Sequence, residues 1–418
     1  MSTARPVHAP LTQFPFEHGE PVIGGTPLSQ LVAQVGRTPF YAYDQQAIAQ
    51  RVAHLRTSLP TGIHLHYAMK ANPLLGLVAQ MAMLVDGLDV ASAGELRTAL
   101  AAGAHPQRIS FAGPGKRDAE LEEAVAAGIL LNVESFREAR TLAQISARQG
   151  KAARVAVRVN PDFELKSSGM KMSGGPKPFG VDAEQVPALL AEIGQMGLGF
   201  EGFHIFAGSQ NLRAAAIIEA QQLSYQLALR LADSAPSAVK SLNLGGGFGI
   251  PYFPGEQRLD LPPIADALHA IADDAHVRMP DAQLVLELGR YLVGEAGVYV
   301  TRIVDRKQSR GQTFLVVDGG LHHHLAASGN FGQVIRKNYP VTIHPARPDL
   351  GATAGSAEVV SVVGPLCTPL DMLADQIESP YAGQVGDLVV VYQSGAYGAS
   401  ASPAAFLSHP ATLEALLP

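Results

Sequence analysis

The sequence predicts a (β/α)8 TIM barrel followed by a C-terminal domain built mainly of antiparallel β-strands. Two observations lead to this fold class. From about residue 62 to residue 295, short apolar runs alternate with longer stretches rich in Ala, Leu and Glu. This alternation predicts parallel βαβ units, and eight such units indicate a closed barrel. After Glu295 the apolar runs continue while the helical stretches thin out, as expected of a second, largely antiparallel domain.

The barrel strands are expected where the apolar runs fall. These are Ile63–Ala68, Leu88–Ala91, Arg108–Ala112, Ile129–Val133, Val155–Val159, Phe200–Phe206, Leu242–Leu244 and Leu284–Glu287. Helices are expected between them, for example over Ala93–Ala102 and Ala183–Met196. Between Pro161 and Pro178 lies a loop rich in Gly, Ser, Lys and Pro. Loops of this length are uncommon and usually have a function or are mobile.

The second domain is predicted from four further runs. They are Val298–Val304, Thr313–Val317, Val359–Val363 and Leu388–Tyr392. The run Phe40–Tyr43, which precedes the barrel, is expected to add a strand to this domain. We therefore divide the chain into an N-terminal segment, residues 1–44, part of which joins the β-domain, a barrel over residues 45–295 and a β-domain over residues 296–418.

Composition excludes several classes of protein. The chain of 418 residues has 47% hydrophobic and 16% charged residues, with a net charge of -6, which excludes intrinsic disorder and argues against a nucleic-acid partner. The start MSTARPVHAP has no apolar core of a signal peptide, and the charge-free run Leu388–Leu413 is broken by Gly, Ser and Pro. Neither suggests secretion or membrane insertion. With a single cysteine, the sequence is typical of a cytoplasmic protein.

Four chemically notable features fall at the carboxyl ends of predicted barrel strands. Lys70 follows the first strand, His204 lies in the sixth, the triple glycine 245–247 follows the seventh and Glu287 closes the eighth. In TIM barrels the active site lies at this end. We therefore expect these residues to meet on one rim.

Each feature has a structural and a chemical interpretation. Lys70 is either a solvated lysine at a strand end or a desolvated amine that forms a Schiff base. Glu287 lies in an apolar run and needs a partner, either a cationic ring nitrogen or Arg290 in an ion pair. His204 is either a core histidine or a ring stacked on a flat cofactor. The glycines form either an ordinary turn or a cradle for a phosphate.

Two other features attract a functional interpretation. The run His322, His323 and His324 invites a metal site, but neighbouring side chains are expected to point in different directions and no Cys or acid stands at ligand spacing. We therefore predict no metal. Gly364 and Pro365 precede Cys367 in the sequence, and Pro369 follows it. Cys367 is therefore expected on a turn, where a reactive thiol is plausible.

Six motifs in order carry a resemblance to a known family. They are YAMKAN (67–72), SAGEL (92–96), GGGFGI (245–250), ELGRYLVGEAG (287–297), a Gly-Pro-x-Cys turn (364–367) and GAYG (395–398). Together they resemble the fold type III pyridoxal-phosphate decarboxylases, the group of diaminopimelate and ornithine decarboxylases. The resemblance runs from about Pro39 to about Pro403. It implies an alanine-racemase-like barrel, a C-terminal β-domain and pyridoxal 5'-phosphate (PLP) as cofactor.

The resemblance also implies residue roles. Lys70 would form the Schiff base and Cys367, from the neighbouring subunit of a homodimer, would return a proton after CO2 leaves. The residues implied in cofactor binding are Lys70, His204, Ser209, Gly245, Gly246, Gly247, Glu287, Gly289, Arg290 and Tyr397. Glu287 would keep the pyridine nitrogen protonated. Those expected at the substrate are Arg290, Arg336, Tyr339, Thr368 and Tyr397.

Departures from the family pattern bear on the substrate. The segment 204–210, HIFAGSQ, is two residues longer than the HIGSQ of relatives, and Thr368 stands where relatives that bind a distal ammonium have an acid. These features are similar to exosortase-associated decarboxylases and to those acting on carrier-protein-bound glutamate. We expect a decarboxylase of a small-molecule or carrier-bound amino acid that is not a free diamino acid. The alternatives are a diaminopimelate decarboxylase, a racemase on the same barrel and a non-catalytic regulatory relative.

Overall fold

The computed structural model describes residues 6–163, 170–171, 175–331, 333, 335–346 and 357–418. Its contacts divide the chain into two compact units. The barrel unit comprises Arg51–Ile250 and Leu259–Tyr291, and the β-domain comprises Met1–Gln50, Pro251–Arg258 and Leu292–Pro418. The predicted loop 161–178 lies partly outside the described residues. The two units are described one after the other.

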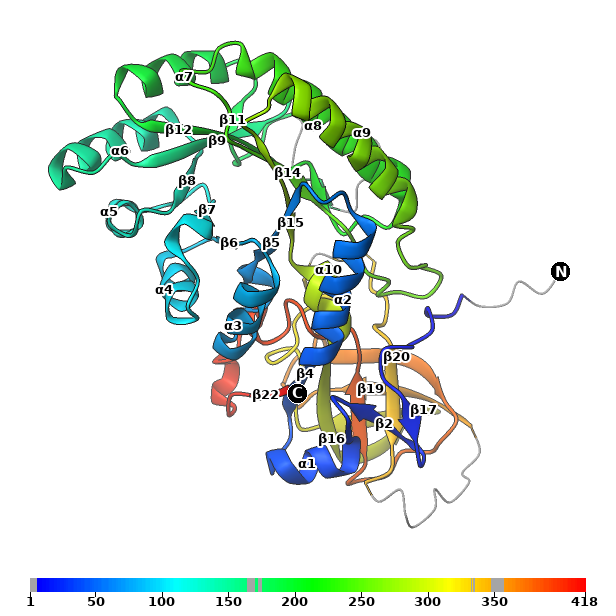
Figure 1. The fold of residues 1–418 in the computed structure, drawn as a ribbon. Helices are drawn as coiled ribbons and strands as arrows, with labels where there is room; N and C mark the ends of the chain where they lie inside the picture. The colour runs from blue at the N-terminus through cyan, green and yellow to red at the C-terminus, as the bar shows by residue number, and fades with distance from the viewer. Residues whose placement is uncertain (1–5, 164–169, 172–174, 332, 334, 347–356) are drawn as a thin grey trace. The chain divides into compact units, whose positions relative to one another are not determined.

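The barrel unit is a closed ring of eight parallel strands, which confirms the predicted fold class (Figure 1). In chain order the strands are β5 (Ile63–Ala68), β6 (Gly87–Val90), β7 (Ile109–Phe111), β8 (Leu130–Val133), β9 (Arg154–Asn160), β12 (Gly199–Ile205), β14 (Ser241–Gly246) and β15 (Gln283–Leu288). β15 pairs with β5 and β8 pairs with β9, so no edge is left in the ring. The short β11 (Val181–Asp182) pairs with β9.

Helices surround the barrel strands (Figure 1). They are α2 (Gln45–Ser58), α3 (Leu75–Leu84), α4 (Ala93–Ala101), α5 (Asp118–Ala127), α6 (Phe136–Gln149), α7 (Val186–Gln195), α8 (Ala214–Ala232), α9 (Pro262–Arg278) and the short α10 (Arg290–Val293). Ser92 begins α4 and Ser135 begins α6, because each hydroxyl accepts a hydrogen bond from the backbone N–H three residues later. These caps fix where the chain turns from a strand end into a helix.

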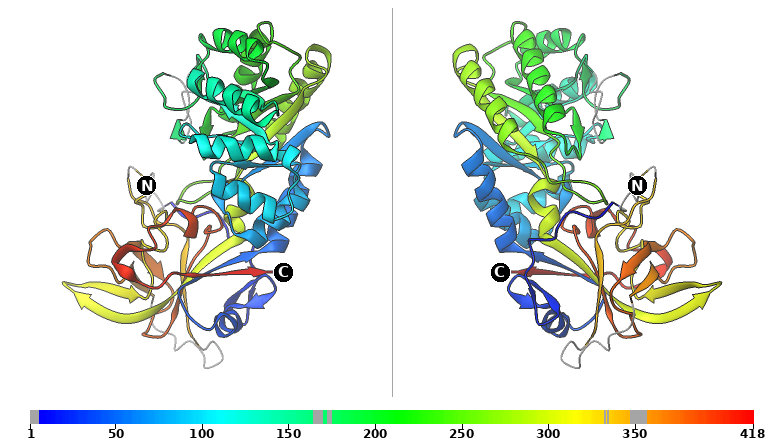
Figure 2. Two further views of the ribbon diagram at one scale, coloured as in Figure 1. Left: turned by 90° about the vertical axis from the view of Figure 1, so that its left-hand side faces the viewer. Right: turned by 90° about the vertical axis from the view of Figure 1, so that its right-hand side faces the viewer.

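The β-domain is organised around one long strand, β16 (Gly297–Ser309). The first half of β16 pairs with β4 (Phe40–Asp44) and β21 (Leu388–Val391), so the N-terminal run does add a strand here. The second half forms a hairpin with β17 (Gln312–Val317), drawn in yellow in Figure 2. Beyond β17 follow β19 (Glu358–Val363) and β20 (Met372–Ser379).

The remaining elements of the β-domain close its core. β18 (Val341–His344) pairs with β21, and β22 (Leu413–Leu417) runs parallel to β4. The N-terminal strands β1 (Phe16–Glu17), β2 (Glu20–Ile23) and β3 (Thr26–Pro27) form a small sheet before α1 (Leu28–Val35). The sheet is mainly antiparallel, as predicted, but β17–β19 and β4–β22 are parallel pairs. Apolar side chains from α1, β4, β16 and β21 pack together as its core.

Candidate active site

Lys70 lies directly after β5, in a single 3-10 turn formed by Met69–Ala71. Its side chain is 47% exposed, and its Nζ atom lies 3.8 Å from Oε1 of Glu287. The Nζ atom also lies 5.6 Å from the centre of the Phe206 ring. The amine is therefore only partly desolvated, because the turn carries it out of the apolar strand. Its position on the rim, facing the carboxylate of the eighth strand, follows the prediction.

Glu287 is a buried carboxylate near the end of β15. Its side chain is 6% exposed and its Oε2 atom lies 3.0 Å from Nε2 of His204. Asn243 on β14 donates a long hydrogen bond of 3.5 Å to the same oxygen. Burial raises the pKa of this carboxyl, but His204, Lys70 and Arg158 outweigh it and hold the pKa well below its usual range. Glu287 is therefore a fixed negative charge that can stabilise a cation above it.

His204 connects this carboxylate to the sixth strand. It is 2% exposed and lies edge-on to the Phe206 ring at 6.4 Å. Its neighbour across the strands is Arg158 on β9, whose guanidinium donates a 2.9 Å hydrogen bond to Glu134. Our sequence reasoning missed Arg158. An arginine in the apolar run of β9 was the available signal, because buried charges in strands need a partner.

The triple glycine forms the end of β14 and the turn after it. A Cβ atom on Gly246 would lie 2.3 Å from the backbone oxygen of Glu287, and one on Gly247 would lie 2.4 Å from that of Gly208. Gly247 also has a φ of +74°, which glycine adopts without strain. The turn is thus packed against two other strand ends. The Gly245 N–H donates a 2.8 Å hydrogen bond to the Asn243 side chain, and glycine turns of this kind can present further backbone N–H groups to a phosphate.

Hydrogen bonds join the glycine turn to the extended segment after β12. The N–H of Asn211 donates to the oxygen of Gly247 at 2.9 Å, and the N–H of Gly249 donates to the oxygen of Asn211 at 2.8 Å. The Gln210 side chain donates to the oxygen of Ile250 and accepts from its N–H. The two loops therefore form one rigid wall of the rim.

Ser209, Gly289 and Arg290 complete the predicted cofactor residues on the barrel. Ser209 belongs to the short strand β13 (Gly208–Ser209), which pairs with β10 (Met170–Lys171). Gly289 follows β15, and a Cβ atom there would lie 3.0 Å from Ala71, beside Lys70. Arg290 begins α10. The structure thus brings all the predicted barrel residues to the same end of the barrel.

Glu95 also lies near this rim. Its Oε2 atom accepts a 2.7 Å hydrogen bond from the N–H of Ala91, at the start of α4. Burial raises its pKa, while this backbone bond and the charge of Lys70 act in the opposite direction. Glu95 is therefore within electrostatic reach of the amine.

Cys367 lies in the β-domain, on an exposed turn between β19 and β20. A buried carboxylate, Asp371, organises this turn by accepting hydrogen bonds from the N–H groups of Leu321 and Leu366, at 2.6 and 2.8 Å. Gly320 and Gly364 both pack against that carboxylate, so closely that a Cβ atom on either would overlap it. Sequence reasoning missed Asp371, because its partners are backbone groups that leave no residue pattern.

Apart from Arg290, the residues predicted at the substrate also lie in the β-domain. Thr368 is half-buried, and its hydroxyl accepts a 3.3 Å hydrogen bond from the N–H of Leu370 within the turn. Arg336 donates to the backbone oxygen of Met372, and burial lowers its pKa. Tyr339 is 4% exposed and packs 4.5 Å from the Tyr252 ring. Thr368 and Arg336 are thus partly occupied by contacts within their own domain.

Tyr397 lies in the turn after β21 with a φ of +54°. Its ring is 6.1 Å from that of Phe331. For a non-glycine residue a positive φ is uncommon and often marks a functional turn. This geometry accompanies the GAYG motif and could not be predicted from composition.

The run His322, His323 and His324 lies in a turn of the β-domain. The ring of His322 lies 3.7 Å from that of His323 and 4.9 Å from that of His409. The expectation that the side chains diverge is therefore wrong for this pair, since a turn brings them together. His324 diverges and bonds to Ser394 at 2.9 Å. Burial lowers the pKa of His322 to about 4, so it is neutral at pH 7.

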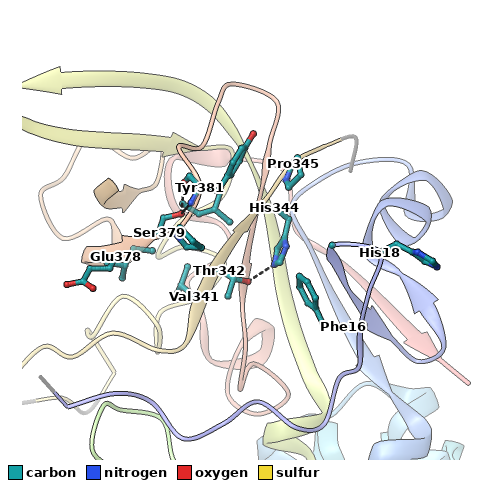
Figure 3. Close-up of a pocket in the computed structure, with 13 residues that line it drawn as sticks. Phe16, His18, Val341, Thr342, His344, Pro345, Glu378, Ser379 and Tyr381 are labelled. Carbon is teal, nitrogen blue, oxygen red and sulfur yellow. Dashed lines mark hydrogen bonds between the residues drawn. The ribbon is translucent and has the colours of Figure 1, made fainter. Parts of the chain in front are cut away.

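A separate cavity of about 350 Å³ lies in the β-domain between the N-terminal hairpin and strands β18 and β20 (Figure 3). Its lining includes Phe16, Ile377 and Tyr381, and a 2.7 Å hydrogen bond joins Thr342 to His344 within it. None of the residues predicted for chemistry lines this cavity. It is therefore distinct from the rim of the barrel.

The chemistry available at the rim follows from these contacts. A primary amine can form a covalent bond with an aldehyde, a buried carboxylate can hold a protonated ring nitrogen, and a glycine wall can bind a phosphate. The rim therefore has the features of a site for a flat, phosphorylated aldehyde.

Among helices of the described residues, none combines the length and apolarity needed to span a bilayer.

Comparisons with known proteins agree with this geometry. The model of the pyridoxal-binding domain of pyridoxal-dependent decarboxylases matches residues 45–294. The chain is 40% identical to the L-glutamyl-(BtrI acyl-carrier protein) decarboxylase of Niallia circulans, over 91% of this chain and 88% of that protein. It is 33% identical to the diaminopimelate decarboxylase of Aquifex aeolicus, over 92% and 87% of the two chains. The crystal structure of Helicobacter pylori diaminopimelate decarboxylase complexed with L-lysine superposes with a TM-score of 0.81 at 29% identity, covering 93% of this chain and 94% of that chain.

Proposed function

The chain belongs to the fold type III pyridoxal-phosphate-dependent decarboxylases, and from this membership we propose that it decarboxylates an amino acid tethered to a carrier protein. The observation that carries the proposal is Thr368. Relatives that bind a distal ammonium offer a carboxylate there, whereas the Thr368 hydroxyl is neutral and caps its own turn. A buried ammonium without a partner charge is costly.

Decarboxylation itself restricts where such a tether is attached. The α-carboxylate leaves as CO2, so it must be free, and a carrier can be bonded only to the far end of the amino acid. A thioester at that end has no charge to be neutralised. A neutral group at position 368 is therefore compatible with a glutamyl group linked in this way, and an L-glutamyl acyl-carrier protein is the substrate named for the Niallia circulans relative.

The barrel rim fits PLP. Glu287 is a buried carboxylate held ionised by its neighbours, and Gly246 and Gly247 leave a wall that a Cβ atom would block. We infer that Lys70, His204, Ser209, Gly245, Gly246, Gly247, Glu287, Gly289, Arg290 and Tyr397 hold the cofactor. When bound, PLP supplies the electron sink for the electron pair that CO2 leaves behind.

The protein's own groups then have separate tasks. Glu287 keeps a proton on the ring nitrogen by its fixed negative charge. The buried His204 holds that carboxylate in place. Cys367, which is exposed, gives a proton to the α-carbon in place of the lost carboxyl group. The product is the primary amine of the same tethered chain.

We also infer a homodimer in which Cys367 of one subunit serves the Lys70 site of its partner. Support comes from the family resemblance and from the exposure of Cys367 on its turn. Mixing Lys70→Ala and Cys367→Ala subunits should restore about a quarter of wild-type activity, because random pairing leaves one intact site in half of the dimers. No recovery, with subunit exchange demonstrated, would mean that each chain completes its own site.

The substrate is tested by offering glutamate free and linked to a carrier protein. We expect the intact mass of the glutamyl carrier to fall by one CO2 during turnover, while free diaminopimelate, lysine and ornithine react slowly. A kcat/KM for a free diamino acid within the usual enzymatic range of about 10⁴–10⁸ M⁻¹s⁻¹ would contradict the tethered substrate. The Lys70→Ala variant serves as the control for non-enzymatic loss.

A further inference from the structure

Helix α8 buries two polar side chains that have no hydrogen-bond partner among the described residues. Gln221 is 1% exposed and both atoms of its amide are unpaired, and Ser224 is 0% exposed with an unpaired hydroxyl. The two residues are three positions apart and therefore lie on the same face of the helix. Buried polar groups are almost always satisfied, by protein or by ordered water. Gln221 thus requires a partner.

A small cavity next to Gln221 indicates what that partner is. The cavity has a volume of about 20 Å³ and is lined by Gln221 together with Gly208, Asn211, Leu244, Gly246 and Gly247. A space of roughly 10–15 Å³ is enough for one water molecule if polar groups surround it. Here the surrounding groups are the Gln221 amide and the backbone of the glycine turn. Ser224 does not line this cavity.

We propose that Gln221 is a positioning residue that holds the glycine turn through one buried water and thereby sets the affinity for the cofactor phosphate. The proposal rests on the assignment of phosphate to residues 245–247 made above. The turn is already bonded to Asn211 on the loop side, by two backbone hydrogen bonds. An amide can donate and accept at once, so Gln221 and a water supply the support from the helix side.

The matched test compares Gln221→Met with Ser224→Ala. Methionine has nearly the shape of glutamine but cannot bond to water, and Ser224 is an equally buried and unpaired group on the same helix face that does not touch the cavity. The dissociation constants of the apoenzyme for PLP and for pyridoxal, which lacks the phosphate, are measured by absorbance, and the melting temperature by calorimetry.

We expect Gln221→Met to weaken PLP binding about fivefold to tenfold, the effect of one hydrogen bond. Pyridoxal binding and the melting temperature should stay near their wild-type values, and Ser224→Ala should change neither affinity. A Gln221→Met variant that melts higher and binds PLP as tightly as wild type would overturn the proposal, since Gln221 would then be a poorly satisfied core residue.

Two further measurements test the same proposal. If Gln221→Met folds poorly, Gln221→Leu is measured in the same way. Independently of the variants, a crystal structure of the wild-type holoenzyme should show one water bonded to the Gln221 amide. An empty cavity there overturns the proposal. Gly247→Ala tests the phosphate assignment separately, because it should lose the preference for PLP over pyridoxal. If that preference persists, the phosphate binds elsewhere and this proposal falls with it.

Discussion

The Asp371 carboxylate gives the sharpest prediction about the β-domain. It is 3% exposed and accepts hydrogen bonds from the N–H groups of Leu321 and Leu366, the second of which precedes Cys367. In Asp371→Asn the side chain keeps one acceptor oxygen, and its NH2 group faces the remaining N–H donor. One of the two buried N–H groups is therefore left unpaired.

The size of the expected stability loss follows from this single unpaired N–H group. An unpaired buried N–H costs about 1–3 kcal/mol. Burial also raises the pKa of the Asp371 carboxyl, so part of the loss is offset because the charge itself is costly in this site. We therefore expect a loss of about 1–2 kcal/mol in stability. The turn should also shift, and a displacement of about 1 Å of the proton donor can lower kcat up to about a hundredfold.

The assay compares Asp371→Asn with Asp375→Asn. Asp375 lies four residues further along the chain, in β20, and is exposed; its side chain accepts one hydrogen bond, from Ser361, which an asparagine oxygen can also accept. Such a change at an exposed position usually alters stability by less than about 0.5 kcal/mol. We expect Asp371→Asn to lose kcat and stability while binding PLP normally, since the barrel residues are untouched. If the two variants are equally stable and equally active, the carboxylate does not organise the Cys367 turn and the reasoning is refuted.

Three further predictions concern other parts of the chain. Lys70→Ala should abolish turnover and the visible absorbance of bound PLP, whereas a yellow variant that borohydride fixes to another lysine would show that Lys70 is not the attachment point. Hydrogen bonds from the Arg117 side chain and the Ala93 N–H lower the pKa of Glu120 from 4.5 to about 2, so its stabilisation is complete above about pH 5 and is lost as the pH falls towards 2. Glu120→Gln should therefore lower the melting temperature at pH 7, by the shift that corresponds to a stability loss of about 1 kcal/mol, the usual effect of a helix cap. The difference in melting temperature between wild type and variant should shrink between pH 5 and 3, and a difference that stays constant would contradict this. Thr368→Glu should raise kcat/KM for free diaminopimelate at least about tenfold relative to the tethered substrate, and an unchanged ratio would mean that position 368 does not select the substrate.

The barrel could be predicted from the sequence because its strands are buried on both sides. Such strands read as continuous apolar runs, so the predicted Val155–Val159 corresponds to β9 at Arg154–Asn160. The meeting of Lys70 with Glu287 at 3.8 Å followed from the same step, since carboxyl ends of parallel strands share one rim. Position in the fold, more than residue type, made these two residues candidates.

Elements with distant partners could not be predicted in the same way. β22 (Leu413–Leu417) pairs with β4, about the whole chain length away in sequence, and its residues LEALL favour helix as much as strand. The roles of Asp371 and Gln221 depend on backbone groups and on a cavity, which leave no periodic pattern. Local sequence signals therefore reached the catalytic side chains but not the groups that hold them in place.

The two-residue extension after β12 and the glycine turn have to be understood together. A Cβ atom on Gly245 would lie 3.0 Å from the Phe206 ring, and one on Gly247 would lie 2.4 Å from the oxygen of Gly208. Both neighbours belong to the extended segment, and Asn211 at its end bonds to the turn. The extended segment therefore packs against the glycine turn and also places Phe206 beside Lys70. Shortening this segment by two residues would remove side-chain and backbone atoms that the turn packs against, while Asn211 and Gln210 could still bond to the turn. Exchanging this loop for that of a relative should therefore succeed best when the glycine turn is exchanged with it.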